Sequence, residues 1–226
     1  MHGLTNRWQK LKPAETRLLA ITAVMSAIFL LALKLTSEVL EGDTNALDRA
    51  ILLRVREATN GTGVAANWLR HFMLDMTALG NNGTLTIVVI GAAGYLLAIG
   101  KRHLAILLTG SSALGLVASG ALKLAFDRPR PELVPHLVAV DTSSFPSGHA
   151  MNSAVIYLTL AVMLARAERR TTPRIYILGV GLLLTIFIGL SRIYVGVHWP
   201  TDVLVGWAFG ATWAAMTALL ARAKSF

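Results

Sequence analysis

Six long apolar runs constrain the fold of this chain more than any other feature of its sequence. A helix that crosses a lipid bilayer needs about 17–25 mostly apolar residues. Runs of this kind lie at 18–35, 84–100, 104–122, 150–165, 174–190 and 203–221. The fourth run is the weakest candidate because Asn152 and Ser153 fall in its first turn. With their connections, the runs occupy nearly all of the 226 residues, so we expect an all-α bundle of six transmembrane helices. This bundle forms a single integral-membrane domain over 1–226, with no separate soluble domain.

The basic residues are distributed unevenly between the expected loops. If the N-terminus is cytoplasmic, the inner segments are 1–17, 101–103, 166–174 and 222–226. These segments carry 12 of the 21 Lys and Arg residues and only two acidic residues, a net charge of +10, whereas the rest of the chain has a net charge of −1. An excess of Lys and Arg on the cytoplasmic side is typical of membrane proteins. The pattern therefore predicts two cytoplasmic termini, and it explains the basic composition without a nucleic-acid partner.

Two further features of the sequence exclude cysteine chemistry and argue against a cleaved signal peptide. The sequence has no cysteine, which excludes disulfides and thiolate metal sites. The first apolar run follows several basic residues, as in a signal peptide, but the bulky and charged LKLTSEVLEG comes after it instead of a small-residue cleavage site. We therefore expect this run to be retained as the first span.

The stretch 36–83 is the least hydrophobic long part of the chain. Within it, EGDTNALDRAILLRVREATN mixes apolar and charged residues in a pattern typical of an amphipathic helix at a membrane surface. GTG and GNNG are turn sequences that bracket a second short helix near 64–78. We interpret 36–83 as an outer, periplasmic segment of short interfacial helices that packs on or covers the domain.

Three polar clusters stand at the ends of the expected spans. KLAFDRPRP follows the third span, PSGH opens the fourth, and SRIYVGVHWPTD joins the fifth to the sixth. Because successive spans cross the membrane in opposite directions, all three clusters fall at the same outer face. Residues far apart in the sequence are therefore expected to meet at one membrane surface.

The first two clusters have the chemistry of a phosphate site. Lys123 and Arg130 place an ammonium and a two-pronged guanidinium at one helix end, although basic residues there also snorkel to lipid headgroups. Ser147 begins a helix whose free N–H groups favour an anion, and Gly148 lets a phosphate approach the backbone. His149 then stands beside it, able to give or take a proton. The alternative is a capped helix with an interfacial histidine.

The third cluster can supply a nucleophile; the alternative is an Asp that only caps the helix and a His that lies among the headgroups. Asp202 follows His198 by four residues across a helix start, so its carboxylate can hydrogen-bond one ring nitrogen and leave the other free to attack. Arg192, at the end of the preceding span, adds another cation. Two histidines and an aspartate are also possible zinc ligands. The neighbouring Lys and Arg side chains would repel a cation, so we favour phosphoryl transfer through a covalent phosphohistidine with no metal.

These clusters resemble the motifs of the type 2 phosphatidic-acid phosphatase superfamily, K-x6-R-P, P-S-G-H and S-R-x5-H-x3-D, in the family's order over 123–202. The resemblance implies that His198 is the nucleophile, that Asp202 orients it, and that His149 is the general acid and base. It also implies a set of phosphate-binding groups: Lys123, Arg130, Ser147, Gly148 and Arg192. Arg128 lies outside the pattern, and we expect it to be a secondary headgroup contact. The resemblance implies no cofactor.

The resemblance implies a phosphatase of the bacterial inner membrane whose site faces the periplasm or exterior. Its substrate would be a phospholipid or polyprenyl phosphate, such as phosphatidylglycerol phosphate, phosphatidic acid or undecaprenyl diphosphate. Lipid A phosphatase or lipid phosphotransferase activity with the same site are alternatives. A lipid transporter is a remote alternative, because its polar segments would lie near the bilayer midplane. The oligomeric state is not predicted.

Overall fold

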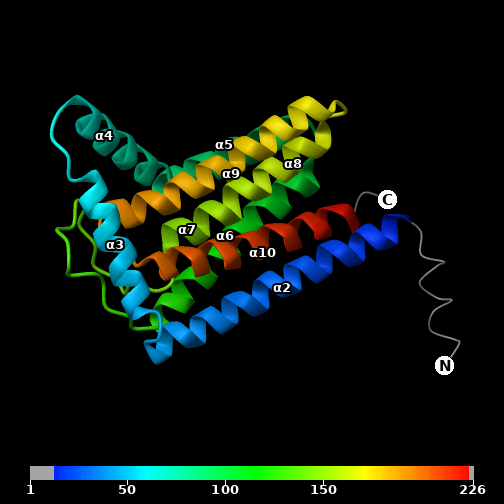
Figure 1. Cartoon of the computed structure of the whole chain (residues 1–226). Coiled ribbons are helices and arrows are strands. Elements are labelled where there is room, and N and C mark those ends of the chain that lie inside the picture. The colour runs from blue at the N-terminus through cyan, green and yellow to red at the C-terminus, as the bar shows by residue number, and fades with distance from the viewer. Residues whose placement is uncertain (1–12, 224–226) are drawn as a thin grey trace, which may run out of the picture.

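The computed structural model describes residues 13–223, and every regular element in that range is helical (Figure 1). The elements, in chain order, are α2 (Pro13–Glu41), α3 (Asn45–Thr59), α4 (Val64–Leu79), α5 (Asn82–Ala98), α6 (Arg102–Ala125), α7 (Gly148–Ser153), the π-helical turn η1 (Ala154–Leu158), α8 (Thr159–Ala167), α9 (Thr171–Tyr194) and α10 (Pro200–Ala223). The all-α prediction is confirmed.

Five helical segments in the described range are long and apolar enough to cross a membrane: Leu18–Glu41, Arg102–Ala125, Gly148–Arg166, Thr171–Tyr194 and Pro200–Ala221. A sixth span exists only if α4 and α5, which meet at 58°, are one broken span. The bend falls at the predicted GNNG turn, where the Asn81 side chain accepts a hydrogen bond from Gly83 N at 2.9 Å and starts α5. The expected second span is thus a 17-residue helix joined at an angle to α4.

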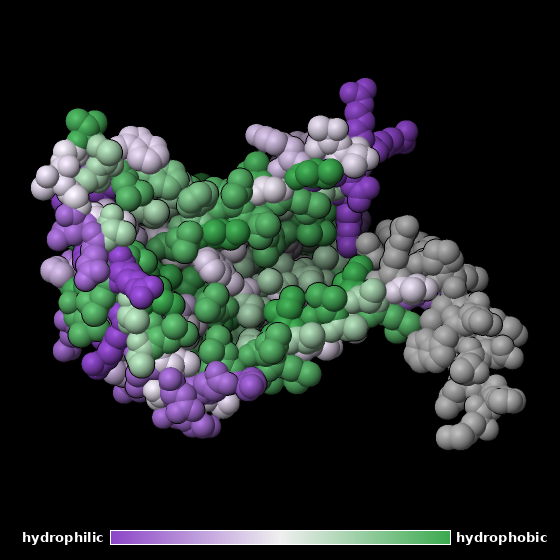
Figure 2. Space-filling model, in the orientation of Figure 1, coloured by the Kyte–Doolittle hydropathy of each residue, from purple (hydrophilic) through white to green (hydrophobic). Residues whose placement is uncertain are grey.

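The long helices lie side by side, and their two ends differ (Figure 1). One end gathers α3, α4 and the connection between α6 and α7, whereas the other holds the start of α2, the end of α10 and the turn between α8 and α9. An apolar belt separates the polar ends on the visible face (Figure 2). Such a belt matches the hydrocarbon layer of a bilayer. Of the predicted inner segments, residues 1–12 and 224–226 lie outside the described part of the chain.

The segment α7–η1–α8 is the central helix of the bundle. In this span 67% of the residues are buried, against 6–39% in the other four. Its burial explains how Asn152 and Ser153 fit at the head of an apolar run: both side chains face protein and not lipid. A core of fully buried Leu85, Leu108, Ile156 and Ile188 joins the central helix to α5, α6 and α9.

Small residues bring α10 against the central helix. A Cβ atom on Gly206 would lie 2.8 Å from the Ser147 carbonyl oxygen, so only glycine allows this approach. The Ser147 N–H donates to the Asp202 carbonyl at 3.0 Å near the same place. This contact fixes the second polar cluster on the third.

Candidate active site

The three polar clusters meet around one cavity of about 320 Å³ at the end of the bundle that carries α3 and α4. Six of the predicted site residues line it: Lys123, Arg130, Gly148, His149, Arg192 and His198. α6, the central helix and α9 each bring one part of the lining, and the turn before α10 brings His198. Gly196, with φ of +80°, allows the tight turn that places His198 there. The structure thus brings together residues that are up to 75 positions apart in the sequence.

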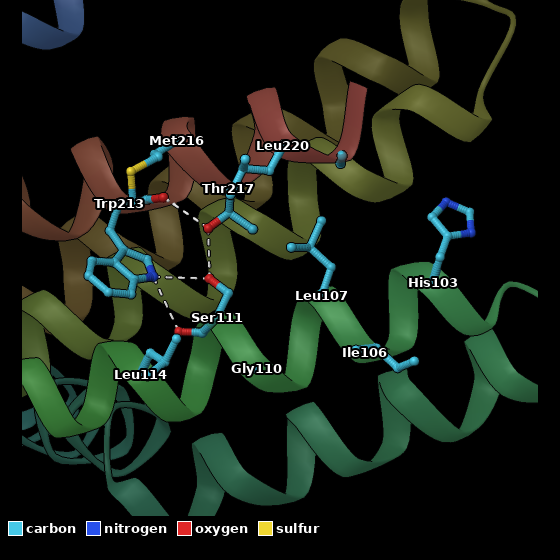
Figure 3. Close-up of a pocket in the computed structure, with 11 residues that line it drawn as sticks. His103, Ile106, Leu107, Gly110, Ser111, Leu114, Trp213, Met216, Thr217 and Leu220 are labelled. Atoms are coloured by element: carbon cyan, nitrogen blue, oxygen red, sulfur yellow. Dashed lines mark hydrogen bonds between the residues drawn. The ribbon is translucent and has the colours of Figure 1, made fainter. Parts of the chain in front are cut away.

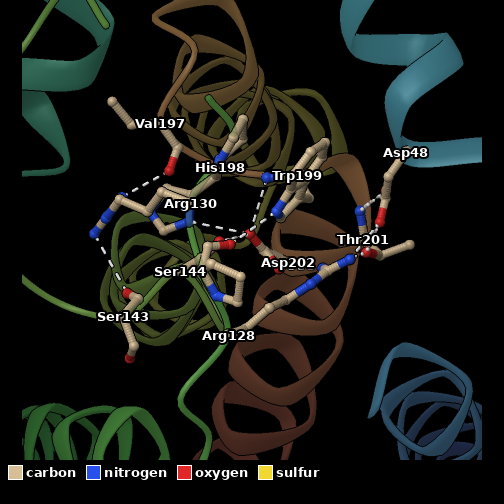
Figure 4. A network of polar contacts seen from close by, with 12 residues as sticks. Asp48, Arg128, Arg130, Ser143, Ser144, Val197, His198, Trp199, Thr201 and Asp202 are labelled. Atoms are coloured by element: carbon tan, nitrogen blue, oxygen red, sulfur yellow. Dashed lines mark hydrogen bonds and ion pairs between the residues drawn. The ribbon is translucent and has the colours of Figure 1, made fainter. Parts of the chain in front are cut away.

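His198, which lines the cavity, and Asp202, which does not, form a buried pair (Figure 4). His198 Nδ1 lies 3.4 Å from Asp202 Oδ2. The same carboxylate oxygen accepts from the Trp199 N–H at 2.8 Å and from the Ser144 hydroxyl. Because Asp202 is held from several sides, its orientation toward the imidazole is fixed.

The surroundings of His198 select one tautomer. Its Nε2 lies 3.5 Å from Arg130 Nη1, and a guanidinium can only donate hydrogen bonds. Nε2 is therefore the bare nitrogen and Nδ1 carries the proton, facing Asp202. Burial lowers the pKa of His198 to about 4, although the hydrogen bond and charge of Asp202 act in the opposite direction. A neutral imidazole thus presents its lone pair to the cavity at neutral pH.

Loop 126–147 holds the two cations of the first cluster. Lys123 Nζ donates to Ser143 O at 2.9 Å and to Thr142 Oγ1 at 3.2 Å. Arg130 donates from Nε to Thr142 O at 2.7 Å and from Nη1 to Val197 O at 2.7 Å. Burial lowers the pKa of Arg130, but a guanidinium stays charged at any ordinary pH. Both cations are fixed in place before any ligand binds.

Two buried donors in the three clusters have no hydrogen-bond partner among the described residues. They are Ser147 Oγ, in a fully buried side chain, and Arg192 Nε, in a side chain that is 4% exposed. Arg192 is anchored at its other end, where Nη1 donates to Thr77 Oγ1 at 2.7 Å. A buried polar group without a partner costs about 1–3 kcal/mol, and a charged one costs more. Arg192 lines the cavity, so an oxyanion there would satisfy its Nε. Ser147 does not line the cavity, although the next residue, Gly148, does.

The second histidine lies at the start of α7. His149 lines the same cavity as His198, and a Cβ on Gly80 would lie 3.0 Å from His149 Cδ2, so the α4–α5 turn packs on its ring. The cavity therefore presents two imidazoles and three cations. Among residues 13–223, no group of three or more His, Asp or Glu side chains is arranged to hold a metal ion.

Arg128, which we expected to be a secondary headgroup contact, is a buried residue. Its side chain is only 9% exposed and is not among those that line the cavity, and the headgroup contact stays a prediction. It donates to Asp202 Oδ1 at 2.6 Å and to Asp48 Oδ2 at 2.8 Å. Two buried carboxylates draw the guanidinium inward, and neither pairing was visible in the motif spacing.

Several residues of the site were missed by the sequence reasoning: Asp48, Thr77, Thr142, Ser143, Ser144 and Thr201. Five are short hydroxyl side chains, three of them in the loop between α6 and α7, and such side chains give no signal until the fold is known. Asp48 did give one. It occupies the same face of α3 as Leu52, four residues on, which is 1% exposed. A carboxylate on an apolar face indicates a buried partner.

A second cavity, of about 460 Å³, lies between α6 and α10 near their other ends (Figure 3). Its polar groups satisfy one another, since Trp213 Nε1 donates to Ser111 Oγ at 3.0 Å and Ser111 Oγ is 2.7 Å from Thr217 Oγ1. Within the described part of the chain, His103 is the one titratable residue that lines it. This cavity is larger than the candidate site, but its lining is mostly apolar and gathers no comparable set of charged groups.

Comparisons with known proteins match the part of the chain that carries these clusters. A model of the PAP2 superfamily matches residues 104–225, which is more than half of the chain and includes all three clusters. Phosphatidylglycerophosphatase B of Bacillus subtilis is 36% identical over 150 residues, which cover 63% of this chain and 70% of that protein. Undecaprenyl-diphosphatase of Sulfolobus acidocaldarius is 39% identical over only 69 residues, 30% of this chain and 29% of that protein.

The fold has a solved counterpart. The crystal structure of a transmembrane PAP2-type phosphatidylglycerolphosphate phosphatase from Bacillus subtilis has a TM-score of 0.78 and 25% sequence identity. The alignment covers 89% of this chain and 97% of that one. The likeness therefore extends well beyond the matched motifs, to the first spans.

Proposed function

The chain belongs to the PAP2 superfamily, as its motifs predicted, and we propose that it hydrolyses a lipid phosphate through a covalent phosphohistidine at His198. It is an integral membrane protein whose relatives are lipid phosphatases. One observation carries the mechanism: an imidazole fixed by Asp202 faces a cavity that Arg192 also lines, and Arg192 Nε is a buried donor without a described partner. A nucleophile and an oxyanion site stand side by side.

In the first step the lone pair of His198 Nε2 attacks phosphorus. The N–P bond forms, the bond from phosphorus to the lipid oxygen breaks, and His149 donates a proton to that oxygen as it leaves. The imidazole becomes a cation, which the Asp202 carboxylate stabilises through Nδ1–H. Five groups hold the phosphoryl oxygens and are in place before the substrate binds: Lys123, Arg130, Ser147, Gly148 and Arg192.

In the second step water replaces the histidine. His149, now neutral, takes a proton from a water molecule, whose oxygen attacks phosphorus as the N–P bond breaks. His198 returns to its neutral form with Nδ1 still protonated, and inorganic phosphate leaves. Charge that develops on the phosphoryl oxygens is matched by three fixed cations, so we propose that the reaction needs no metal ion.

We further propose the bacterial inner membrane as the location, with the site at the periplasmic or exterior face. The cavity lies at the end of the bundle that carries α3 and α4, so the lipid tail stays in the bilayer while the phosphate reacts. The single domain over 1–226 belongs to this proposal.

Within the lipid phosphates, we propose a substrate with a hydroxyl close to the reacting phosphate, such as phosphatidylglycerol phosphate. Asn152 lies one helical turn below His149 on the cavity wall and is 5% exposed. Its Nδ2 donates to Asn82 Oδ1 at 3.2 Å, but its Oδ1 has no partner among the described residues. A glycerol hydroxyl can donate to this oxygen, whereas a second phosphate of a diphosphate offers only acceptors at neutral pH.

The test is phosphate release by the purified protein in detergent with excess chelator. The panel is phosphatidylglycerol phosphate, phosphatidic acid, undecaprenyl diphosphate and lipid A, with the protein boiled as a blank. We expect release without added metal, fastest for phosphatidylglycerol phosphate. Release that stops in chelator and returns with a divalent ion would contradict metal independence. Labelled phosphate that appears on a second lipid instead of in solution would indicate a phosphotransferase.

The lowered pKa of His198 predicts the pH range in which its imidazole stays neutral. Because burial lowers this pKa from 6.5 to about 4, the nucleophile stays neutral in mildly acidic solution and is lost only as the pH falls through about 4. We expect the His198 signal in spectra of histidine-labelled protein to titrate near that pH, identified by its absence in His198→Asn. A midpoint at or above 6.5 would show that His198 is protonated more readily than its burial allows.

A further inference from the structure

We propose that Asp48, on α3, is a positioning residue for the His198–Asp202 pair and acts through Arg128. The inference rests on the proposed function. It assigns a role to the segment 36–83, in which no motif of the family was found. The four side chains form one chain of contacts from α3 to the nucleophile (Figure 4).

The contact between α3 and α10 is built around the Asp48 carboxylate, which is fully buried. Its Oδ1 accepts from the Thr201 N–H at 3.0 Å, and its Oδ2 accepts from the Thr201 hydroxyl at 2.6 Å. Asp48 therefore caps the first turn of α10 from another helix. The residue after Thr201 is Asp202, so this cap fixes the backbone that carries the orienting carboxylate.

The Arg128 guanidinium donates hydrogen bonds to two carboxylates. Nη2 donates to Asp48 Oδ2 at 2.8 Å, and Nη1 donates to Asp202 Oδ1 at 2.6 Å and to Thr201 Oγ1 at 2.9 Å. Its guanidinium also lies 5.6 Å above the Trp199 ring. The two oxygens of Asp202 thus have different partners, since Oδ1 is held by Arg128 and Oδ2 faces His198.

The charges explain why Asp48 matters to the reaction. A lone Arg128 beside Asp202 would neutralise that carboxylate and draw both oxygens toward itself. Asp48 takes part of the guanidinium's hydrogen bonding and charge, so Asp202 keeps a negative charge for the imidazolium that forms during attack. Without Asp48 the ground state would change little at the phosphate site, but the transition state would lose stabilisation.

Other contacts show that this face of α3 is fixed in the same place. Leu52, one turn after Asp48, packs with Val134, Ala150 and Val203. Arg56, one further turn on, donates to Pro135 O at 3.1 Å. The spacing of four residues puts these side chains on one face of the helix. This face of α3 therefore packs firmly beside the site, and Asp48 makes its polar contact with α10.

The experiment compares kcat and KM of Asp48→Asn with those of the parent protein and of Glu57→Gln. Glu57 is an exposed carboxylate on the same helix, so its replacement removes the same charge without touching the network. We expect Asp48→Asn to lower kcat about 10–100-fold with KM within about twofold, since the phosphate-binding cations are untouched. Glu57→Gln should behave like the parent. An Asp48→Asn protein with the parent's kcat would overturn the inference.

A double variant separates positioning from simple stability. If Asp48 serves only to neutralise a buried Arg128, removing both charges in Asp48→Asn/Arg128→Met, which leaves no donor at position 128, should restore kcat. We expect kcat of the double variant to stay at least about tenfold below that of the parent, because Asp202 Oδ1 then lacks its donor.

Should the single variant fail to fold, Thr201→Val removes the bridging hydroxyl while keeping the shape of the side chain, and kcat should fall about threefold or more. An unchanged kcat in Thr201→Val would count against the inference. His198→Ala in the same assay shows whether the phosphohistidine mechanism itself holds.

Discussion

Replacing His198 with alanine is expected to lower phosphate release by about 10⁴-fold or more, which corresponds to about 5.5 kcal/mol of transition-state stabilisation. The size follows from the two-step scheme, because without Nε2 no covalent intermediate forms and only positioning by the cations remains. The measurement is the initial rate with phosphatidylglycerol phosphate, at protein concentrations matched by absorbance. Melting temperature is recorded for each variant, so that unfolding is recognised.

The matched control is His103→Ala. This residue lies at the opposite end of α6 from Lys123, on the second cavity (Figure 3), so the same chemical change is made far from the site. It should leave the rate within about twofold of the parent. Labelled substrate and rapid quenching in alkali, where phosphohistidine survives, should give one labelled histidine in the parent and none in His198→Ala. A fully active His198→Ala protein would show that the assigned nucleophile is wrong.

The sequence predicted the long helices well because the signal for each is summed over many residues. The runs at 174–190 and 203–221 lie inside α9 and α10. The second span was predicted less well. Its apolar run is real and lies mostly within α5, but this helix has only 17 residues and is joined to α4 at a bend of 58°. Hydropathy measures composition over a window and does not reveal a bend.

In the site too, contacts between residues close in the sequence were predicted, whereas contacts between distant segments were not. Spacing placed His198 and Asp202 within reach of each other because both lie across one helix start, a local geometry that sequence specifies. The burial of Arg128 was not predicted, because its partners come from α3 and α10, 80 and 74 residues away. Hydrogen bonds between distant segments depend on how helices pack. The sequence showed an arginine beside a motif but not the two carboxylates that bury it.

Replacing His149 with asparagine is expected to separate the two chemical steps. With a lipid phosphate, turnover should fall about 10²–10⁴-fold, because neither the leaving oxygen nor the attacking water has its proton partner. With p-nitrophenyl phosphate the leaving group needs no proton, so His198 can still attack. The second step still needs a base and becomes slow. We therefore expect a burst of about one nitrophenolate per protein, followed by slow release.

The burst tests the division of labour between the two histidines. Labelled phosphate should remain on His198 in His149→Asn long after the parent has released it, and His149→Asn/His198→Ala should show neither label nor burst. Steady turnover at the parent's rate, with no burst, would mean that another group activates the water. Because both imidazoles line one cavity, yet only His198 has an Asp to stabilise its cation among the described residues, the structure favours the assignment of nucleophile to His198 and proton carrier to His149.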